Sequence, residues 1–139
     1  MSEREGQGLP SFRYELEKQP PKPGVGPGGT TRQASAHEFS VSTGIAGVSM
    51  RLELGGIREL HWHANAAEWA YVVDGYCRTT ILHPTGDAAS DDFGPGDVWY
   101  FPKGYGHSIQ GLGQGSATSS SSSLTDTSLK ITPSASLTG

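Results

Sequence analysis

The stretch GGIRELHWHANAAEWAYVVDG, residues 55–75, combines a clear strand pattern with the densest group of potential metal ligands in the chain. Its part EWAYVV, 68–73, is rich in aromatic and β-branched residues. It ends at Asp74-Gly75, a pair that favours a two-residue turn with positive φ, and YCRTTIL, 76–82, follows. The stretch therefore predicts two strands joined as a hairpin.

The sequence on both sides continues this β pattern. IAGVSMRLEL at 45–54 alternates apolar and polar residues, and DVWYF at 97–101 follows a Gly-Pro-Gly-Asp turn. No window of helix length has a convincing 3.6-residue period. Short strands between Gly/Pro turns predict an all-β antiparallel barrel or sandwich. Aromatic residues expected in the core or in a pocket wall are Trp62, Trp69, Tyr71, Trp99 and Phe101.

Composition divides the 139 residues into three parts around one small domain. Residues 1–33 form a leader with a Pro/Gly-rich linker, and residues 34–113 form the domain. In 114–139, 14 of the 26 residues are Ser or Thr, so this tail has too little apolar surface to order itself and we expect disorder.

Charge and cysteine content exclude several classes of protein. The net charge of −4 argues against a nucleic-acid binder, and no apolar run is long enough to span a membrane. The single cysteine, Cys77, cannot form an internal disulfide, and we expect it to be a buried thiol. The first residues lack a secretory signal, so we expect a cytoplasmic protein; secretion is the alternative if a signal peptide is missing from this chain.

A candidate metal site follows from four residues. His61 and His63 point to the same face of a strand, Glu68 begins the next apolar run, and His107 follows the turn after DVWYF. Three imidazoles and a carboxylate suit Mn²⁺, Fe²⁺, Zn²⁺ or Ni²⁺, and the absence of cysteine ligands argues against a structural zinc site. The alternative for the first two histidines is a half-exposed surface pair.

These residues match two motifs of the cupin superfamily. Residues 55–75 match G(x)5HxH(x)4E(x)6G, and residues 96–107 match G(x)5PxG(x)2H. Gly111 stands where an Asn often ends the second motif. The resemblance implies a single jelly-roll β-barrel, also called a double-stranded β-helix. Cupins commonly associate through their sheets, so it also implies a homo-oligomer.

The segments IRELHWH, AEWAYV, GDVWYFPKG and GHSIQGL resemble the first domain of bicupin oxalate decarboxylases, especially the fungal type. The likeness covers about residues 9–113. It implies that His61, His63, Glu68 and His107 hold Mn²⁺ and that Arg58 pairs with a carboxylate of oxalate. With O2 as a cofactor, the implied reaction converts oxalate to formate and CO2.

The chain departs from these enzymes beyond residue 113. The family has an acidic lid there whose glutamate transfers the proton, whereas this chain has a serine run and no Glu after Glu68. The second cupin domain is also absent from the sequence. We therefore expect a barrel that is incomplete at its C-terminal edge, unless residues 124–131 fill that edge. Three functions stay open: an oxalate decarboxylase, weak or inactive as a fragment; an oxalate oxidase; and a non-catalytic cupin that binds a metal or a carboxylate.

Overall fold

The computed structural model describes residues 8–22, 28–113 and 125–132, and every strand pairing among them is antiparallel. No helix in these ranges is long and apolar enough to cross a membrane. The all-β prediction is confirmed. The elements are η1 (Leu16–Lys18), β1 (Gly29–Ala34), β2 (Ala46–Leu52), β3 (Ile57–His61), β4 (Glu68–Val72), β5 (Tyr76–Leu82), β6 (Ala88–Phe93), β7 (Val98–Phe101), β8 (Gly106–Gly113) and β9 (Thr125–Thr132).

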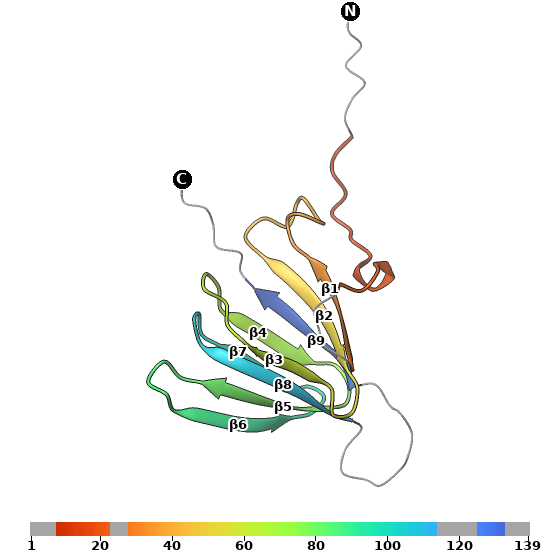
Figure 1. The fold of residues 1–139 in the computed structure, drawn as a ribbon. Coiled ribbons are helices and arrows are strands. Elements are labelled where there is room, and N and C mark those ends of the chain that lie inside the picture. Colours follow the sequence, from red (N-terminus) through yellow and green to blue (C-terminus); the bar gives the residue numbers. More distant parts are fainter. Residues whose placement is uncertain (1–7, 23–27, 114–124, 133–139) are drawn as a thin grey trace, which may run out of the picture.

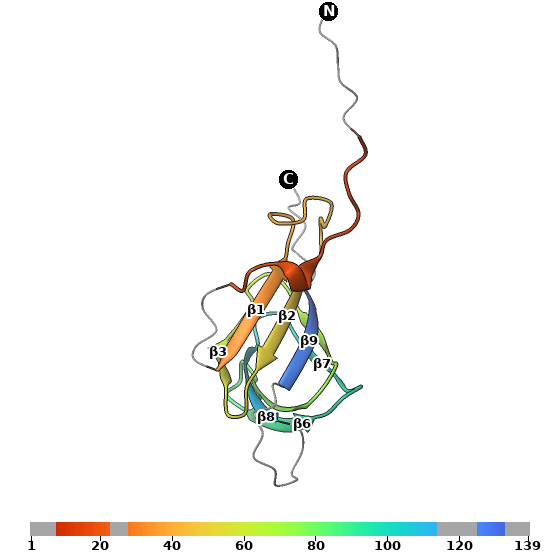
Figure 2. The ribbon, with the colours of Figure 1, turned by 90° about the vertical axis from the view of Figure 1, so that its right-hand side faces the viewer.

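The strands form two sheets that fold toward each other around the core (Figures 1 and 2). One sheet has the order β1-β2-β9-β4-β7, and the other has the order β3-β8-β5-β6. The short helix η1 lies against β1 and β2, where an ion pair of 3.0 Å joins Glu17 to Arg51. This arrangement is a cupin-like jelly roll. Its β1 crosses the predicted boundary between leader and domain at residues 33 and 34.

The turn at Asp74-Gly75 exists, but the predicted hairpin is wrong. Gly75 has a φ of 70°, as the sequence predicts. However, β4 pairs with β7 and β9, whereas β5 pairs with β6 and β8. The end of β4 bonds instead to the turn before β7, because Val72 N–H donates to the carbonyl of Asp97. The turn therefore carries the chain from one sheet to the other.

Among the residues whose side chains the structure describes, eight apolar residues make up the buried core: Met50, Leu52, Ala70, Val72, Cys77, Trp99, Phe101 and Ile109. Two of the five aromatic residues expected there, Trp99 and Phe101, are buried. Trp62, Trp69 and Tyr71 are not part of the core, because their exposed fractions are 65%, 40% and 40%. In β4 the inward positions belong to Glu68, Ala70 and Val72, and strand alternation turns the intervening aromatic residues outward.

The strand β9 is the central strand of the five-stranded sheet. Its backbone pairs with β2 on one side and with β4 on the other. It lies inside the range 114–139 for which a disordered tail was predicted, and it matches the alternative that residues 124–131 fill the open edge. Residues 114–124 and 133–139, the rest of the predicted tail, lie outside the described residues.

Candidate metal centre

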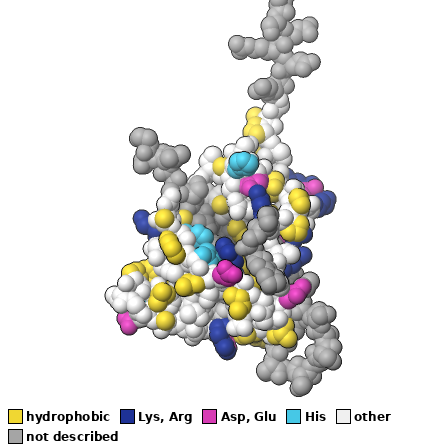
Figure 3. All heavy atoms as spheres, in the orientation of Figure 1, with side chains coloured by type: hydrophobic (Ala, Val, Ile, Leu, Met, Phe, Trp, Pro, Cys, Tyr) yellow, Lys and Arg dark blue, Asp and Glu magenta, His cyan; other side chains and the backbone are white. Residues whose placement is uncertain are grey.

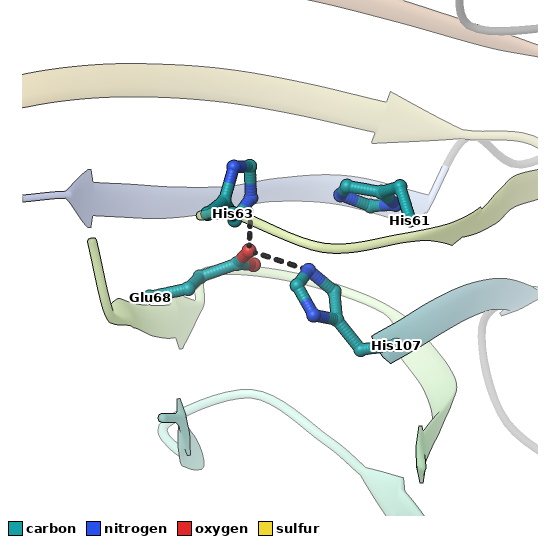
Figure 4. A group of neighbouring side chains, drawn as sticks. All are labelled: His61, His63, Glu68 and His107. Atoms are coloured by element: carbon teal, nitrogen blue, oxygen red, sulfur yellow. Dashed lines mark hydrogen bonds and ion pairs between the residues drawn. The ribbon is translucent and has the colours of Figure 1, made fainter. Parts of the chain in front are cut away.

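Four side chains from three strands and one loop meet inside the barrel. His61 ends β3, His63 follows in the loop, Glu68 begins β4 and His107 lies near the start of β8. Each offers a ligand atom, and these four atoms lie within 4.8 Å of one another (Figure 4). The two sheets thus bring together the four residues that the spacing singled out.

The carboxylate of Glu68 lies at the centre of the group. Its Oε2 atom is 2.8 Å from Nε2 of His107 and 3.2 Å from Nε2 of His63. Glu68 and His107 are 1% exposed, whereas the side chain of His63 is 30% exposed. Figure 3 shows histidine side chains reaching the surface among apolar and charged groups. The site is therefore closed around Glu68 and His107 and partly exposed at His63.

Backbone carbonyls set the tautomers of two histidines. Nδ1 of His61 is 2.7 Å from the carbonyl oxygen of Glu59, and Nδ1 of His107 is 3.0 Å from that of Tyr105. A carbonyl oxygen can only accept a hydrogen bond, so each Nδ1 donates its proton. In the neutral ring, Nε2 then carries the lone pair that a metal ion requires.

The donor set fits a divalent cation. Nε2 of His107 is buried and makes no hydrogen bond, although it lies 2.8 Å from the Glu68 carboxylate. Two acceptors at this distance repel each other unless a positive charge lies nearby, and buried polar atoms normally have a partner. A metal ion held by both atoms removes this conflict. Three imidazoles and one carboxylate suit Mn²⁺, Fe²⁺, Zn²⁺ and Ni²⁺.

Aromatic side chains from β7 support the ligands. The ring of Phe101 stacks on His107 with 4.3 Å between ring centroids, and Nε1 of Trp99 donates to Oε1 of Glu68 at 3.3 Å. The sequence predicts both residues only as part of the core or of a pocket wall. The period-2 alternation of VWYF could have indicated this contact, because it places Trp99 and Phe101 on the same face of β7, the face toward Glu68.

Strand register places Arg58 relative to the site. Arg58 pairs with Ile109 and His61 pairs with His107, so β3 uses one more residue than β8 over this interval. Residues directly opposite each other in a sheet share a face, and both partners on β8 are buried on the inner face. The irregularity in β3 therefore puts Arg58 and His61 on the same face, despite their odd spacing.

The remaining histidines and the cysteine lie outside the group. His37 and His83 are exposed, and Nδ1 of His83 is bonded to the Thr85 hydroxyl. Cys77 is buried, as predicted, and burial raises the pKa of its thiol to about 12. This cysteine therefore stays protonated at neutral pH and does not act as a thiolate ligand.

Comparison with known proteins gives the same picture. The profile of the Cupin family matches residues 15–135. The chain is 50% identical over 88 residues to oxalate decarboxylase OxdC of Bacillus subtilis, which covers 63% of this chain and 23% of that protein. It is 42% identical over 85 residues to a probable oxalate decarboxylase of Arthroderma benhamiae, covering 61% and 21% of the two chains. The chain thus spans less than a quarter of the length of these relatives.

Solved structures agree with the sequence matches. The structure of oxalate decarboxylase from Bacillus subtilis superimposes with a TM-score of 0.75 at 35% identity, covering 94% of this chain and 31% of that one. A second structure of the bacterial enzyme, whose Mn(II) centres were studied by electron paramagnetic resonance, has a TM-score of 0.75 at 34% identity with the same coverage. The likeness therefore extends over nearly the whole of this chain.

Proposed function

Because this chain belongs to the cupin family, we propose that it binds Mn²⁺ through His61, His63, Glu68 and His107 and acts on oxalate. The observation that carries the proposal is the convergence of four donor atoms within 4.8 Å. The Mn(II) centres of the bacterial relative favour manganese among the ions that suit this donor set.

Electrostatics of the site support an anionic substrate. A divalent ion with one carboxylate ligand keeps a net positive charge, which attracts a small carboxylate. Arg58 is half-buried on the face that carries His61, and a guanidinium can bind a carboxylate through two parallel hydrogen bonds. We therefore assign to Arg58 the pairing with one carboxylate of oxalate, while the other faces the metal.

The proposed reaction is the redox-neutral cleavage of oxalate. The C–C bond of the mono-anion breaks, one carbon leaves as CO2, and the proton of the carboxyl group ends on the carbon of formate. The bound ion, together with O2, supplies the Lewis-acid and redox chemistry. The chain itself binds and orients the substrate and shields it from water on the core side, where Glu68 and His107 are buried.

A specific sequence observation favours a second outcome. The connection between β8 and β9, residues 114–124, contains no ionisable side chain. A decarboxylase needs a group that delivers a proton to carbon, and general acid catalysis typically contributes about 10²–10⁴-fold. Without such a group, oxidation of oxalate by O2 to two CO2 and hydrogen peroxide is the competing reaction.

Metal analysis and product analysis test the proposal together. Purified wild-type chain should contain one Mn²⁺ per protein after loading, and His61→Ala should lose it. His83→Ala, which changes an exposed histidine outside the group, is the matched control. Formate from oxalate under air supports the decarboxylase, and peroxide supports the oxidase. Bound metal without either product leaves a binding protein, and an equal metal content in all three chains overturns the site.

A further inference from the structure

The two oxygens of the Glu68 carboxylate have different surroundings. Oε2 faces the imidazoles of His63 and His107, at 3.2 and 2.8 Å. Oε1 accepts a hydrogen bond from Nε1 of Trp99 at 3.3 Å, in a fully buried setting. An indole N–H can only donate a hydrogen bond, so Trp99 binds one oxygen of the carboxylate and does not itself compete for the metal ion.

Packing holds the Trp99 ring in one orientation. Trp99 is 4% exposed, and its strand partner on β4 is Ala70, which is completely buried. Phe93 meets the indole edge to face at 5.5 Å, and Phe101 stacks on it at 5.9 Å between ring centroids. Because both rings pack against the indole and protein interiors are close-packed, the ring cannot turn its N–H away from Glu68 without repacking the core.

We propose that Trp99 is a positioning residue that makes Glu68 a one-oxygen ligand. The inference rests on the proposed function, and concerns how the metal site is kept open. A carboxylate that binds through both oxygens occupies two coordination positions. By holding Oε1, Trp99 leaves three imidazole nitrogens and one oxygen, so two positions of a six-coordinate ion stay available for oxalate and O2.

The variant Trp99→Phe tests this directly, because it removes the N–H and keeps an aromatic ring between Phe93 and Phe101. Trp69→Phe is the matched control, since Trp69 lies on the outer face of β4. Loss of an outer hydrogen bond to a metal ligand typically lowers metal affinity about 10–100-fold, and we expect a rise of this size in the Kd for Mn²⁺. The control should keep the wild-type Kd.

The number of ligand oxygens is read separately, from the visible absorption of the Co²⁺-loaded chains. If Oε1 is released to the ion in Trp99→Phe, the coordination number rises and the Co²⁺ bands lose intensity relative to wild type and Trp69→Phe. A Co²⁺ spectrum of Trp99→Phe identical to that of wild type overturns the proposal, whatever the affinity.

A measurement on the wild-type chain covers the case in which Trp99→Phe does not fold. The chain has three tryptophans, so ¹⁵N-tryptophan labelling gives three indole resonances, and Trp62→Phe and Trp69→Phe assign Trp99 by elimination. The Trp99 resonance should shift during Zn²⁺ titration and saturate at one equivalent. An indole resonance that ignores bound Zn²⁺ overturns the inference alone, whereas a wild-type chain that binds none of these ions overturns the proposed function with it.

Discussion

Metal binding should raise the thermal stability of this chain in a way that depends on His107. The four ligands come from β3, the loop after it, β4 and β8, so an unfolded chain cannot gather them. A ligand that binds only the folded state stabilises it by about 2.7 kcal/mol at a concentration 100 times its Kd. In a domain of this size, that free energy corresponds to a rise in Tm of about 10–20 °C.

The diagnostic quantity is the slope of Tm against metal concentration. Above the Kd, each tenfold increase in free Mn²⁺ adds about 1.4 kcal/mol, or about 5–10 °C. Scanning calorimetry from a chelated baseline upward measures this slope for wild type, His107→Ala and the control His83→Ala. His107→Ala should have a lower baseline Tm, because the stacking on Phe101 is lost, and almost no slope. Equal slopes in wild type and His107→Ala would refute the reasoning.

Three further predictions concern the scaffold. In Gly111→Ala the new Cβ would lie 2.3 Å from the carbonyl oxygen of Glu53. We therefore expect urea unfolding to give a free energy of unfolding about 1–3 kcal/mol below that of wild type, and no decrease for the control Gly8→Ala, which has open space around it. Equal free energies of unfolding for Gly111→Ala and wild type would contradict this steric argument. The Lys22 ammonium, together with hydrogen bonds from the hydroxyl and the backbone N–H of Ser35, lowers the pKa of Glu38 from 4.5 to about 2. The stability from these contacts is therefore complete above pH 4.5 and lost as the pH falls toward 2. Glu38→Gln should cost about 1 kcal/mol at neutral pH and nothing at the acid end, and a pH-independent difference would count against the pairing. A chain that stops before β9 should lose its cooperative unfolding transition by circular dichroism, because the pair β1-β2 and the pair β4-β7 are then no longer joined in one sheet; a wild-type Tm would show that β9 contributes nothing.

Most of the candidate site could be predicted from the sequence because three of its four residues lie within eight positions of one another. Strand alternation predicts that His61 and His63 face the same way, and Glu68 follows within one loop, so local geometry limits where these groups can go. The structure ends β3 at His61 and places His63 in the loop, yet both side chains still belong to the group. His107 was predicted from its place after the strand DVWYF and its turn, on the condition that this strand pairs alongside, and the second motif pointed to the same residue. The structure brings all four together, and their role as metal ligands stays a prediction.

Features that depend on tertiary pairing were missed. The segment of β6, AASDDF, is polar and mostly exposed, and it is a strand because it pairs with β5 rather than because of its composition. Trp69 and Trp99 look alike in sequence, yet one is outside the barrel and the other donates to Glu68. Asp74-Gly75 has turn chemistry, but no local signal tells a hairpin from a crossing between sheets.

The central place of β9 has a consequence for how the molecule is made on the ribosome. All four site residues precede this strand in the sequence, and β9 is the neighbour that joins β2 to β4. During synthesis the histidines and Glu68 emerge first, and β4 can pair only with β7 until β9 arrives. All four ligand residues can therefore have left the ribosome before β9 joins β2 to β4 and completes the five-stranded sheet.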